Sequence, residues 1–244
     1  MIDTIAVIDD TLIERMSMNN ADRAYLLVEE GRKTEASIIS THPGGGAINS
    51  AVSFARLGFS VTTLVKLGRD ARAQAIRDAL VAEGVSPELV AETNIAGTGA
   101  SVMVSAHERN AAIFTFRGAN SYLDKSDVSR ATFSQNIVYI TGLSNQSADV
   151  FPFIVELAAA QGAFVAANPG IRQLSARGDA FQAALSKISL LSMNREEAAA
   201  LLPRLLERQR TPSQRYLPPV TRQTPQLMRS GLSASGFDMA LPHF

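Results

Sequence analysis

The fold is decided by residues 42–58, which read HPGGGAINSAVSFARLG. Three consecutive glycines lead directly into a run of small and apolar residues that ends at Gly58. Because glycine has no Cβ atom, its backbone N–H groups stay open to close approach by a ligand. A helix that begins after these glycines adds unpaired N–H donors and partial positive charge at the same place. The stretch therefore predicts a binding site at the start of a helix.

On both sides of this stretch, short apolar runs alternate with segments of helical periodicity. The pattern predicts strands at 61–67, 136–141, 164–167 and 188–192, and helices at 47–57, 71–83, 148–161, 178–186 and from Asn194 onward. Strands separated by helices of this length imply βαβ units. Residues 101–106 and 111–116 flank four polar residues and predict a hairpin. We therefore predict an α/β fold, a Rossmann-like, layered and mostly parallel sheet flanked by helices, with a small β-lid.

Composition narrows the function classes. The chain has 244 residues, of which 46% are apolar, and its formal net charge is zero, so nothing favours nucleic acid as a partner. It has no cysteine, which excludes disulfides and thiolate metal sites, and its three histidines show no metal-ligand spacing. No apolar run reaches membrane-spanning length, and no basic segment precedes an apolar one at the N-terminus. We expect no membrane partner and a cytoplasmic location.

The last 41 residues differ from the rest. Residues 204–244 contain six Arg, no Lys, one Glu and one Asp, and five of the ten prolines of the chain. Their apolar periodicity is poor, so we expect an irregular basic tail after a domain that spans 1–203. Two explanations stay open, a basic interaction tail or a truncated or out-of-frame gene end, and the second is favoured because the pattern stops in mid-fold.

Several motifs occur in a characteristic order. They are Gly44-Gly45-Gly46 with Asn49, KLGRD at 66–70, Thr98-Gly99-Ala100, Gly118-Ala119-Asn120, Asn168-Pro169-Gly170, and Asn194 with Glu197. In this combination the chain resembles the ribokinase-like (PfkB) carbohydrate and nucleoside kinases over residues 1 to about 203. The resemblance implies a sugar or nucleoside kinase that transfers the ATP γ-phosphoryl group to a sugar hydroxyl. It also implies a lid built from about 10–40 and 98–118, through which a homodimer can form.

The resemblance assigns roles to particular residues. It implies sugar or nucleoside binding by Asp3, Gly44, Gly45, Gly46, Asn49, Asn120 and Asn168, and an association with Mg²⁺ and phosphate by Asn194 and Glu197. For each residue there is an alternative explanation that needs no ligand. The resemblance places Asp3 at the end of the family's first strand, and the alternative is a carboxylate on the protein surface. Asn120 and Asn168 are alternatively turn residues, and Asn194 with Glu197 is alternatively a capping box, with Asn at the N-cap and Glu at N3 of a helix.

The family's catalytic segment, Gly-Ala-Gly-Asp, has no match in this sequence. Its backbone N–H groups hold developing negative charge and its Asp removes the hydroxyl proton. The nearest string, Ser235-Gly236-Phe237-Asp238, places a phenylalanine where phosphate needs a glycine. We interpret Asp238 as a chance match to the catalytic Asp of the family, without a catalytic role, and assign no catalytic residue. We expect the C-terminal part of the family fold, including the adenine site, to be missing. The resemblance therefore implies ATP and Mg²⁺ as cofactors of the family, while binding of either by this chain is in doubt.

Two other functions stay open. One is a non-catalytic sugar-binding or regulatory protein that uses the same pocket without ATP turnover. The other is a dinucleotide-binding protein, which needs Gly-x-Gly-x-x-Gly directly after the first strand. The run at Gly44–Asn49 lacks that spacing. We expect a chain of kinase lineage that keeps the sugar-binding half and is inactive as given; the sequence does not name the sugar.

Overall fold

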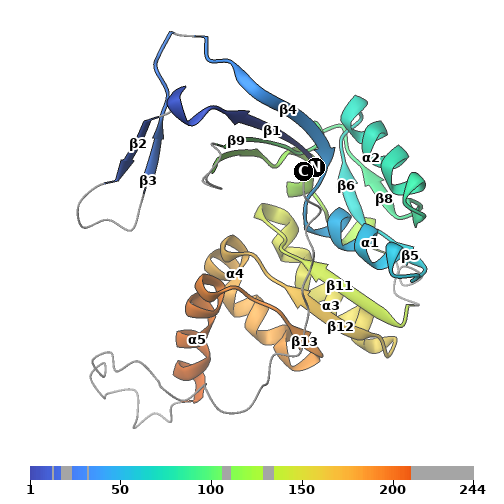
Figure 1. Cartoon of the computed structure of the whole chain (residues 1–244). Helices are drawn as coiled ribbons and strands as arrows, with labels where there is room; N and C mark the ends of the chain where they lie inside the picture. Colours follow the sequence, from blue (N-terminus) through green and yellow to red (C-terminus); the bar gives the residue numbers. More distant parts are fainter. Residues whose placement is uncertain (13, 18–23, 32, 106–110, 129–134, 210–244) are drawn as a thin grey trace. The chain divides into compact units, whose positions relative to one another are not determined.

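The structure is a computed structural model that describes residues 1–12, 14–17, 24–31, 33–105, 111–128 and 135–209 (Figure 1). Residues Met1–Leu205 form one compact unit, and Leu206–Phe244 form a second. The predictions for residues 210–244, Asp238 included, lie outside the described residues. Everything below concerns the first unit and the helix that leads out of it.

Five α-helices are described: α1 (Gly46–Arg56), α2 (Ala71–Ala82), α3 (Phe151–Ala160), α4 (Ile171–Ala184) and α5 (Arg195–Gln209). The first three lie close to their predicted ranges. Helix α4 begins well before the predicted 178, because a kink with non-helical φ and ψ at Arg177 interrupts its apolar period. Helix α5 continues to Gln209, so residues 204–209 of the predicted irregular tail are helical. The Arg, Leu, Glu and Gln residues of this segment are good helix formers.

The lid is a four-stranded sheet in the order β10-β9-β1-β4, which we call the lid sheet. Its strands are β1 (Ile2–Ile8), β4 (Ala36–Pro43), β9 (Ala100–Ser105) and β10 (Ala111–Phe116). Strand β1 lies between β4, with which it pairs antiparallel, and β9, with which it pairs parallel (Figure 1). Strands β9 and β10 pair antiparallel, as predicted for the hairpin. A separate hairpin joins β2 (Glu14–Ser17) and β3 (Ala24–Leu27). The lid thus includes residues 2–8, which the prediction of a lid from about residue 10 left out.

The remaining sheets are all parallel. One has the order β11 (Ile137–Thr141), β12 (Phe164–Asn168), β13 (Leu190–Leu191), and two pairs join β5 (Val61–Thr62) to β7 (Val85–Ser86) and β6 (Val65–Leu67) to β8 (Val90–Glu92). The single strand predicted over 61–67 is therefore split, because its first part pairs with β7 and its last part with β8. Parallel strands alternating with helices confirm the α/β prediction.

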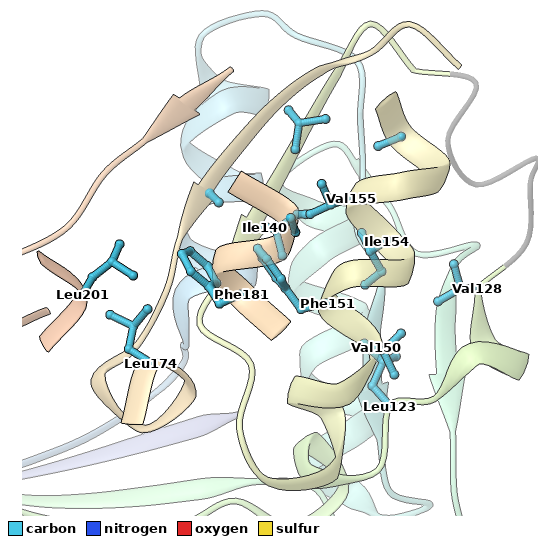
Figure 2. Packing of buried hydrophobic residues seen from close by; sticks show 14 residues of the cluster. Leu123, Val128, Ile140, Val150, Phe151, Ile154, Val155, Leu174, Phe181 and Leu201 are labelled. Carbon is cyan, nitrogen blue, oxygen red and sulfur yellow. The ribbon is translucent and has the colours of Figure 1, made fainter. Parts of the chain in front are cut away.

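Two separate hydrophobic clusters stabilise the unit. The larger one lies around β11, β12, α3 and α4, where Phe151 and Phe181 stack with ring centroids 4.8 Å apart (Figure 2). The smaller one joins β1, α1, α2 and β6 through Ile2, Ile48, Leu67 and Ile76. Fully burying an aliphatic or phenylalanine side chain contributes about 1.5–3 kcal/mol. Each cluster therefore stabilises its own half of the unit.

A buried ion pair connects β6 to the segment that follows the lid sheet. Lys66 Nζ donates to both carboxylate oxygens of Asp127 at 2.6 Å, and the two side chains are 9% and 10% exposed. Removing one partner of such a pair leaves a buried charge and costs about 3–5 kcal/mol. None of the helices in the described part of the chain is long and apolar enough to cross a membrane.

Candidate functional site

The carboxylate of Asp3 lies against the glycine run. Asp3 is the second residue of β1, where its neighbours are His42 on β4 and Ser101 on β9. Ser101 Oγ donates a hydrogen bond of 2.6 Å to Asp3 Oδ1. A Cβ atom at position 44 would lie 1.9 Å from Asp3 Oδ2, so an alanine there would have to displace the Asp3 carboxylate. The resemblance put Asp3 at the end of a core strand; it lies instead at the start of a lid strand, because Ile2–Ile8 pairs with β4 and β9.

The second and third glycines form the start of α1. Gly45 is the N-cap residue at φ +93°, a left-handed conformation that strongly favours glycine, and no side chain caps the helix. A Cβ atom on Gly46 would lie 3.0 Å from Thr141 Cβ, at the carboxyl end of β11. The helix N-terminus is thus free of a protein cap and lies where β11 ends. This is the arrangement that favours an anion or a hydroxyl oxygen.

Asn49 lies one turn into α1 and is exposed. Its backbone N–H bonds to Gly45 O at 3.0 Å, and no hydrogen bond within the described part of the chain occupies its side-chain amide. The two serines of the same helix behave differently, since Ser50 and Ser53 donate back to carbonyls of their own turn. The Asn49 amide is therefore available to a ligand.

A hollow of about 640 Å³ opens beside the glycines. Its polar lining includes Gly44–Gly46, Arg117, Asn120 and Thr141, and the rest of its wall is mostly apolar. The structure thus brings four of the predicted site residues, the three glycines and Asn120, to one cavity. Asp3 adjoins it through Gly44, while Asn49, Asn168, Asn194 and Glu197 do not line it.

Asn120 is positioned by a compact turn. It belongs to the 3-10 turn Gly118–Ser121, whose first residue has φ +48° and whose Ala119 N–H bonds to Gly97 O at 2.8 Å. A Cβ atom on Gly99 would lie 3.0 Å from Asn120 Nδ2, so the side-chain amide of Asn120 packs against the residue directly before β9. The turn and the entrance to the lid sheet therefore fix each other.

Asp70 secures that entrance from the other side. It is the N-cap of α2, where its side chain accepts from Ala73 N, and its Oδ2 accepts from Thr98 N at 2.7 Å. Desolvation alone would raise the pKa of Asp70, but the hydrogen bonds from Thr98 and Ala73 outweigh it and hold the pKa below its ordinary value. The KLGRD motif thus has an observed structural role, fastening the lid sheet to α2.

Asn168 lies at the end of β12, beside the end of β11. Its register partner is Thr141, the residue that touches Gly46. Its side-chain Nδ2 donates to Ser192 O at 2.8 Å, so it holds the connection between β13 and α5. Gly142 and Gly170 approach so closely that a Cβ atom on Gly142 would lie 2.8 Å from Gly170 N. The backbone around Asn168 is therefore tightly packed, and its amide already has a protein partner.

Asn194 and Glu197 form a reciprocal capping box at the start of α5. Glu197 N donates to Asn194 Oδ1, and Asn194 N donates to Glu197 Oε2, both at 2.9 Å. Glu197 is buried, and no cluster of three or more His, Asp or Glu side chains that could hold a metal occurs in the part of the chain that the structure describes. The observed contacts are those of helix capping, and the association of the two residues with Mg²⁺ and phosphate stays a prediction.

Sequence reasoning missed three residues of the site: Ser101, Thr141 and Arg117. Ser101 and Thr141 reach it through strand pairing and helix packing, which leave no local signal. Arg117 directly precedes the Gly118-Ala119-Asn120 motif and lines the hollow. Desolvation, and then the nearby charge of Arg172, lower the pKa of Arg117. Its place next to a recognised motif is the one signal that could have identified it.

Comparison with known proteins agrees with this geometry. Residues 3–223 match the family described as pfkB family carbohydrate kinase. The deoxyribokinases of Salmonella typhi and Salmonella typhimurium are each 30% identical to the chain over 128 residues, which is 52% of this chain and 40% of theirs. The chain thus spans less than half the length of these relatives.

Solved structures show the same fold. Ribokinase of Arabidopsis thaliana, in complex with ribose and ATP, is 21% identical with a TM-score of 0.61, and 82% of this chain covers 59% of that one. Adenosine kinase of Anopheles gambiae is 17% identical with a TM-score of 0.62, and 85% of this chain covers 68% of that one. With the family match extending over most of its length, the chain belongs to the pfkB family of carbohydrate kinases.

Proposed function

We propose that this chain binds a sugar, or the sugar part of a nucleoside, between Asp3 and the start of α1. The observation that carries the proposal is the close approach of the Asp3 carboxylate to Gly44, where a Cβ atom would lie 1.9 Å from Asp3 Oδ2. A carboxylate accepts hydrogen bonds from two neighbouring hydroxyls, and hydrogen bonds to a charged group are the stronger ones. The unoccupied amide of Asn49 and the lining residue Asn120 add donors and acceptors. Asn168, already bonded to Ser192, supports the strand ends around them.

The same proposal assigns no phosphoryl transfer to this 244-residue chain. Its sequence has no Gly-Ala-Gly-Asp segment, so it lacks both the base and the backbone donors that the family's reaction uses. Asn194 Oδ1 and Glu197 Oε2 each accept a hydrogen bond from the other residue's backbone N–H, so their proposed association with Mg²⁺ and phosphate has to coexist with helix capping. We infer a sugar-binding chain of kinase lineage that turns over no ATP and holds nucleotide weakly.

Calorimetric titration tests the binding. The ligands are ribose, 2-deoxyribose, fructose and adenosine, with ATP and Mg²⁺ in a second series. We expect one sugar or nucleoside to bind, no heat from ATP hydrolysis, and loss of sugar binding in Asp3→Asn. A ligand present at 100 times its Kd raises stability by about 2.7 kcal/mol, so thermal unfolding provides an independent readout. Folded protein that binds none of the four ligands contradicts the proposal.

Asn194→Ala is the matched control for Asp3→Asn. It removes a polar side chain from another proposed site residue but leaves the Asp3–Gly44 contact intact. It should therefore bind sugar as the unaltered chain does. Equal loss of binding in both variants would show that binding depends on general stability and not on Asp3.

We also propose that the lid sheet forms a homodimer. Ile39, Val102 and Phe114 lie on one face of it by register and are 70%, 46% and 64% exposed. Contiguous exposed apolar side chains of this kind mark interaction surfaces. Analytical ultracentrifugation should give a dimer that Phe114→Glu converts to a monomer, with Leu57→Glu, a change at a similarly exposed residue at the end of α1, as the control.

A further inference from the structure

Arg117 is a half-buried cation without an acidic partner beside the proposed sugar site. It lines the hollow, and among the residues that the structure describes no carboxylate pairs with its guanidinium group. The other basic side chain of the lining, Lys66, is neutralised by Asp127, and none of the described residues that line the hollow is an Asp or a Glu. Because a charge taken partly out of water is unfavourable unless it is paired, an anionic ligand is favoured at Arg117.

A second arginine adds to the positive charge at this place. Arg172 is the second residue of α4, is exposed, and also has no ion pair within the described part of the chain. Burial lowers the pKa of Arg117, and the nearby charge of Arg172 lowers it further. The two guanidinium groups therefore repel each other, and an anion bound to Arg117 would offset this repulsion.

The start of α4 brings backbone donors to the same place. Its N-cap is Gly170, and no side chain caps it. Gly142, which lines the hollow directly after β11, packs so closely against this N-cap that a Cβ atom on it would lie 2.8 Å from Gly170 N. The N-terminus of α4 therefore lies at the carboxyl end of β11, and the N-terminus of a helix favours an anion.

Ser144 gives independent evidence for a ligand. Its side chain is 6% exposed and lines the hollow two residues after Gly142. It caps no helix, and no hydrogen bond within the described residues uses its hydroxyl group. Ser147, three residues later, instead donates to Asn120 O and accepts from Leu123 N. Since buried hydroxyl groups almost always have a partner, the Ser144 hydroxyl is free to bond to a ligand.

Asp3 and Arg117 are far enough apart to bind two different groups of one ligand. Asp3 pairs in register with Ser101 on β9, Ser101 pairs with Thr115 on β10, and Arg117 follows two residues later. Neighbouring strands lie about 4.8 Å apart, so the backbones of β1 and β10 are separated by about 10 Å. A ligand whose hydroxyls bond to Asp3 can therefore place a negative group at Arg117 without bringing it against the Asp3 carboxylate.

We propose that the sugar bound at Asp3 carries a carboxylate or phosphate group, and that Arg117 and Ser144 hold this group at the carboxyl end of β11. This inference rests on the proposed function and specifies its substrate class, a sugar acid or a sugar phosphate. The guanidinium group donates two parallel hydrogen bonds to either anion, and the Ser144 hydroxyl donates another. Arg172 and the N-terminus of α4 add positive potential. We call Arg117 and Ser144 the anion subsite.

Matched ligands separate the anion subsite from the sugar site. Calorimetric titration of the full chain uses ribose, ribonate and ribose 5-phosphate, and then glucose, glucuronate and glucose 6-phosphate. We expect at least one anionic ligand to bind at least about tenfold more tightly than its neutral parent, and the comparison of acid with phosphate identifies the group. Arg117→Gln should abolish this preference. Asp3→Asn should weaken neutral and anionic ligands while the preference persists.

Two further variants control for charge and for folding. Arg56→Gln removes one positive charge at the exposed far end of α1 and should keep the preference for the anion. Ser144→Ala keeps both arginines and should lose part of the preference, so the test does not depend on Arg117→Gln alone. Inorganic phosphate tests the anion subsite without a sugar. It should raise the Tm of the unaltered chain, of Asp3→Asn and of Arg56→Gln, but not that of Arg117→Gln.

The anion subsite and the sugar site can fail separately. Equal binding of the neutral and anionic forms of each sugar, or an equal preference in Arg117→Gln and Arg56→Gln, overturns the anion subsite and leaves the sugar site at Asp3 intact. Protection by phosphate that depends on Arg117, without binding of any sugar, supports the anion subsite and overturns the sugar site. If no sugar binds and phosphate has no effect through Arg117, both are wrong.

Discussion

Two polar clusters of the proposed site differ in the distance along the chain over which they are assembled. Asp3 meets Ser101 across 98 residues and the glycine run across 41, through strand pairing in the lid sheet. Asn194 and Glu197 meet across three residues, within the first turn of one helix. Both clusters contain residues to which the resemblance to the family assigns a role. The difference teaches that a short-range motif is explained by its own helix, whereas a long-range contact exists only because the fold brings it together.

The two clusters also differ in what their hydrogen bonds contribute to the stability of the fold. A capping box stabilises a helix by satisfying N–H groups that the helix itself leaves unpaired. The Asp3 carboxylate satisfies no such need, since it begins a strand and receives one hydrogen bond from a serine. Polar groups that structure does not require are the better candidates for ligand binding. The following predictions test this ranking, in order of decreasing expected effect.

Gly44→Ala should have the largest effect on binding. Its methyl group would overlap Asp3 Oδ2, so the Asp3 carboxylate has to turn away from the start of α1. Because the end of a side chain can rotate, the loss of stability should stay below the roughly 1–3 kcal/mol of an overpacked core, but displacement of Asp3 should remove sugar binding altogether. Chemical denaturation and calorimetric titration measure the two effects. Gly170→Ala is the matched control, because a Cβ atom there meets nothing closer than 3.9 Å.

Asp3→Asn should lower sugar affinity while the fold persists. A hydrogen bond to a charged group contributes about 1.5–3 kcal/mol, so affinity should fall by roughly 10- to 150-fold. Ser101→Ala should have a smaller effect on affinity, because it removes only the side chain that orients the carboxylate. If Ser101→Ala weakens binding more than Asp3→Asn does, the carboxylate is not the group that holds the sugar.

Asp70 provides a pH test of the connection between α2 and the lid sheet. Its pKa is lowered in the folded state, so its contribution is present above the unfolded-state pKa and is lost as pH falls through the folded-state pKa. Asn also caps helices but does not titrate, so Asp70→Asn should reduce stability near pH 7 by about 1 kcal/mol and make it fall less steeply in acid. Urea unfolding between pH 7 and pH 3 measures this. Parallel acid profiles for the two proteins would contradict the assignment.

Asn194→Ala and Glu197→Ala should change sugar binding least. Loss of an N-cap costs about 0.5–2 kcal/mol, and the double variant should cost less than the sum, because each side chain bonds to the other residue's backbone. Sugar affinity should stay unchanged in all three variants. A large loss of affinity would break the comparison and move this cluster into the ligand site.

The sequence by itself determined the parts that depend on neighbouring residues. The glycine run followed by α1, the capping box at Asn194, the β9–β10 hairpin and the alternation of strands and helices follow from turn chemistry, capping and apolar period. The ordered motifs also determined the family, which the match over residues 3–223 confirms. The prediction of element bounds failed at two places. The kink at Arg177 interrupts the apolar period of α4, and the segment predicted as one strand pairs with two different strands and is split into β5 and β6.

Only the tertiary structure decided which distant residues meet. An apolar strand such as Ile2–Ile8 has the same pattern whether it joins a core sheet or the lid sheet, because a period of two carries no information about the partner. Its pairing with β4 and β9 put Asp3 beside Gly44 and Ser101, and the packing of α1 put Gly46 beside Thr141. Strand order in the sheets arises in the same way, because long-range packing sets it and single segments do not encode it.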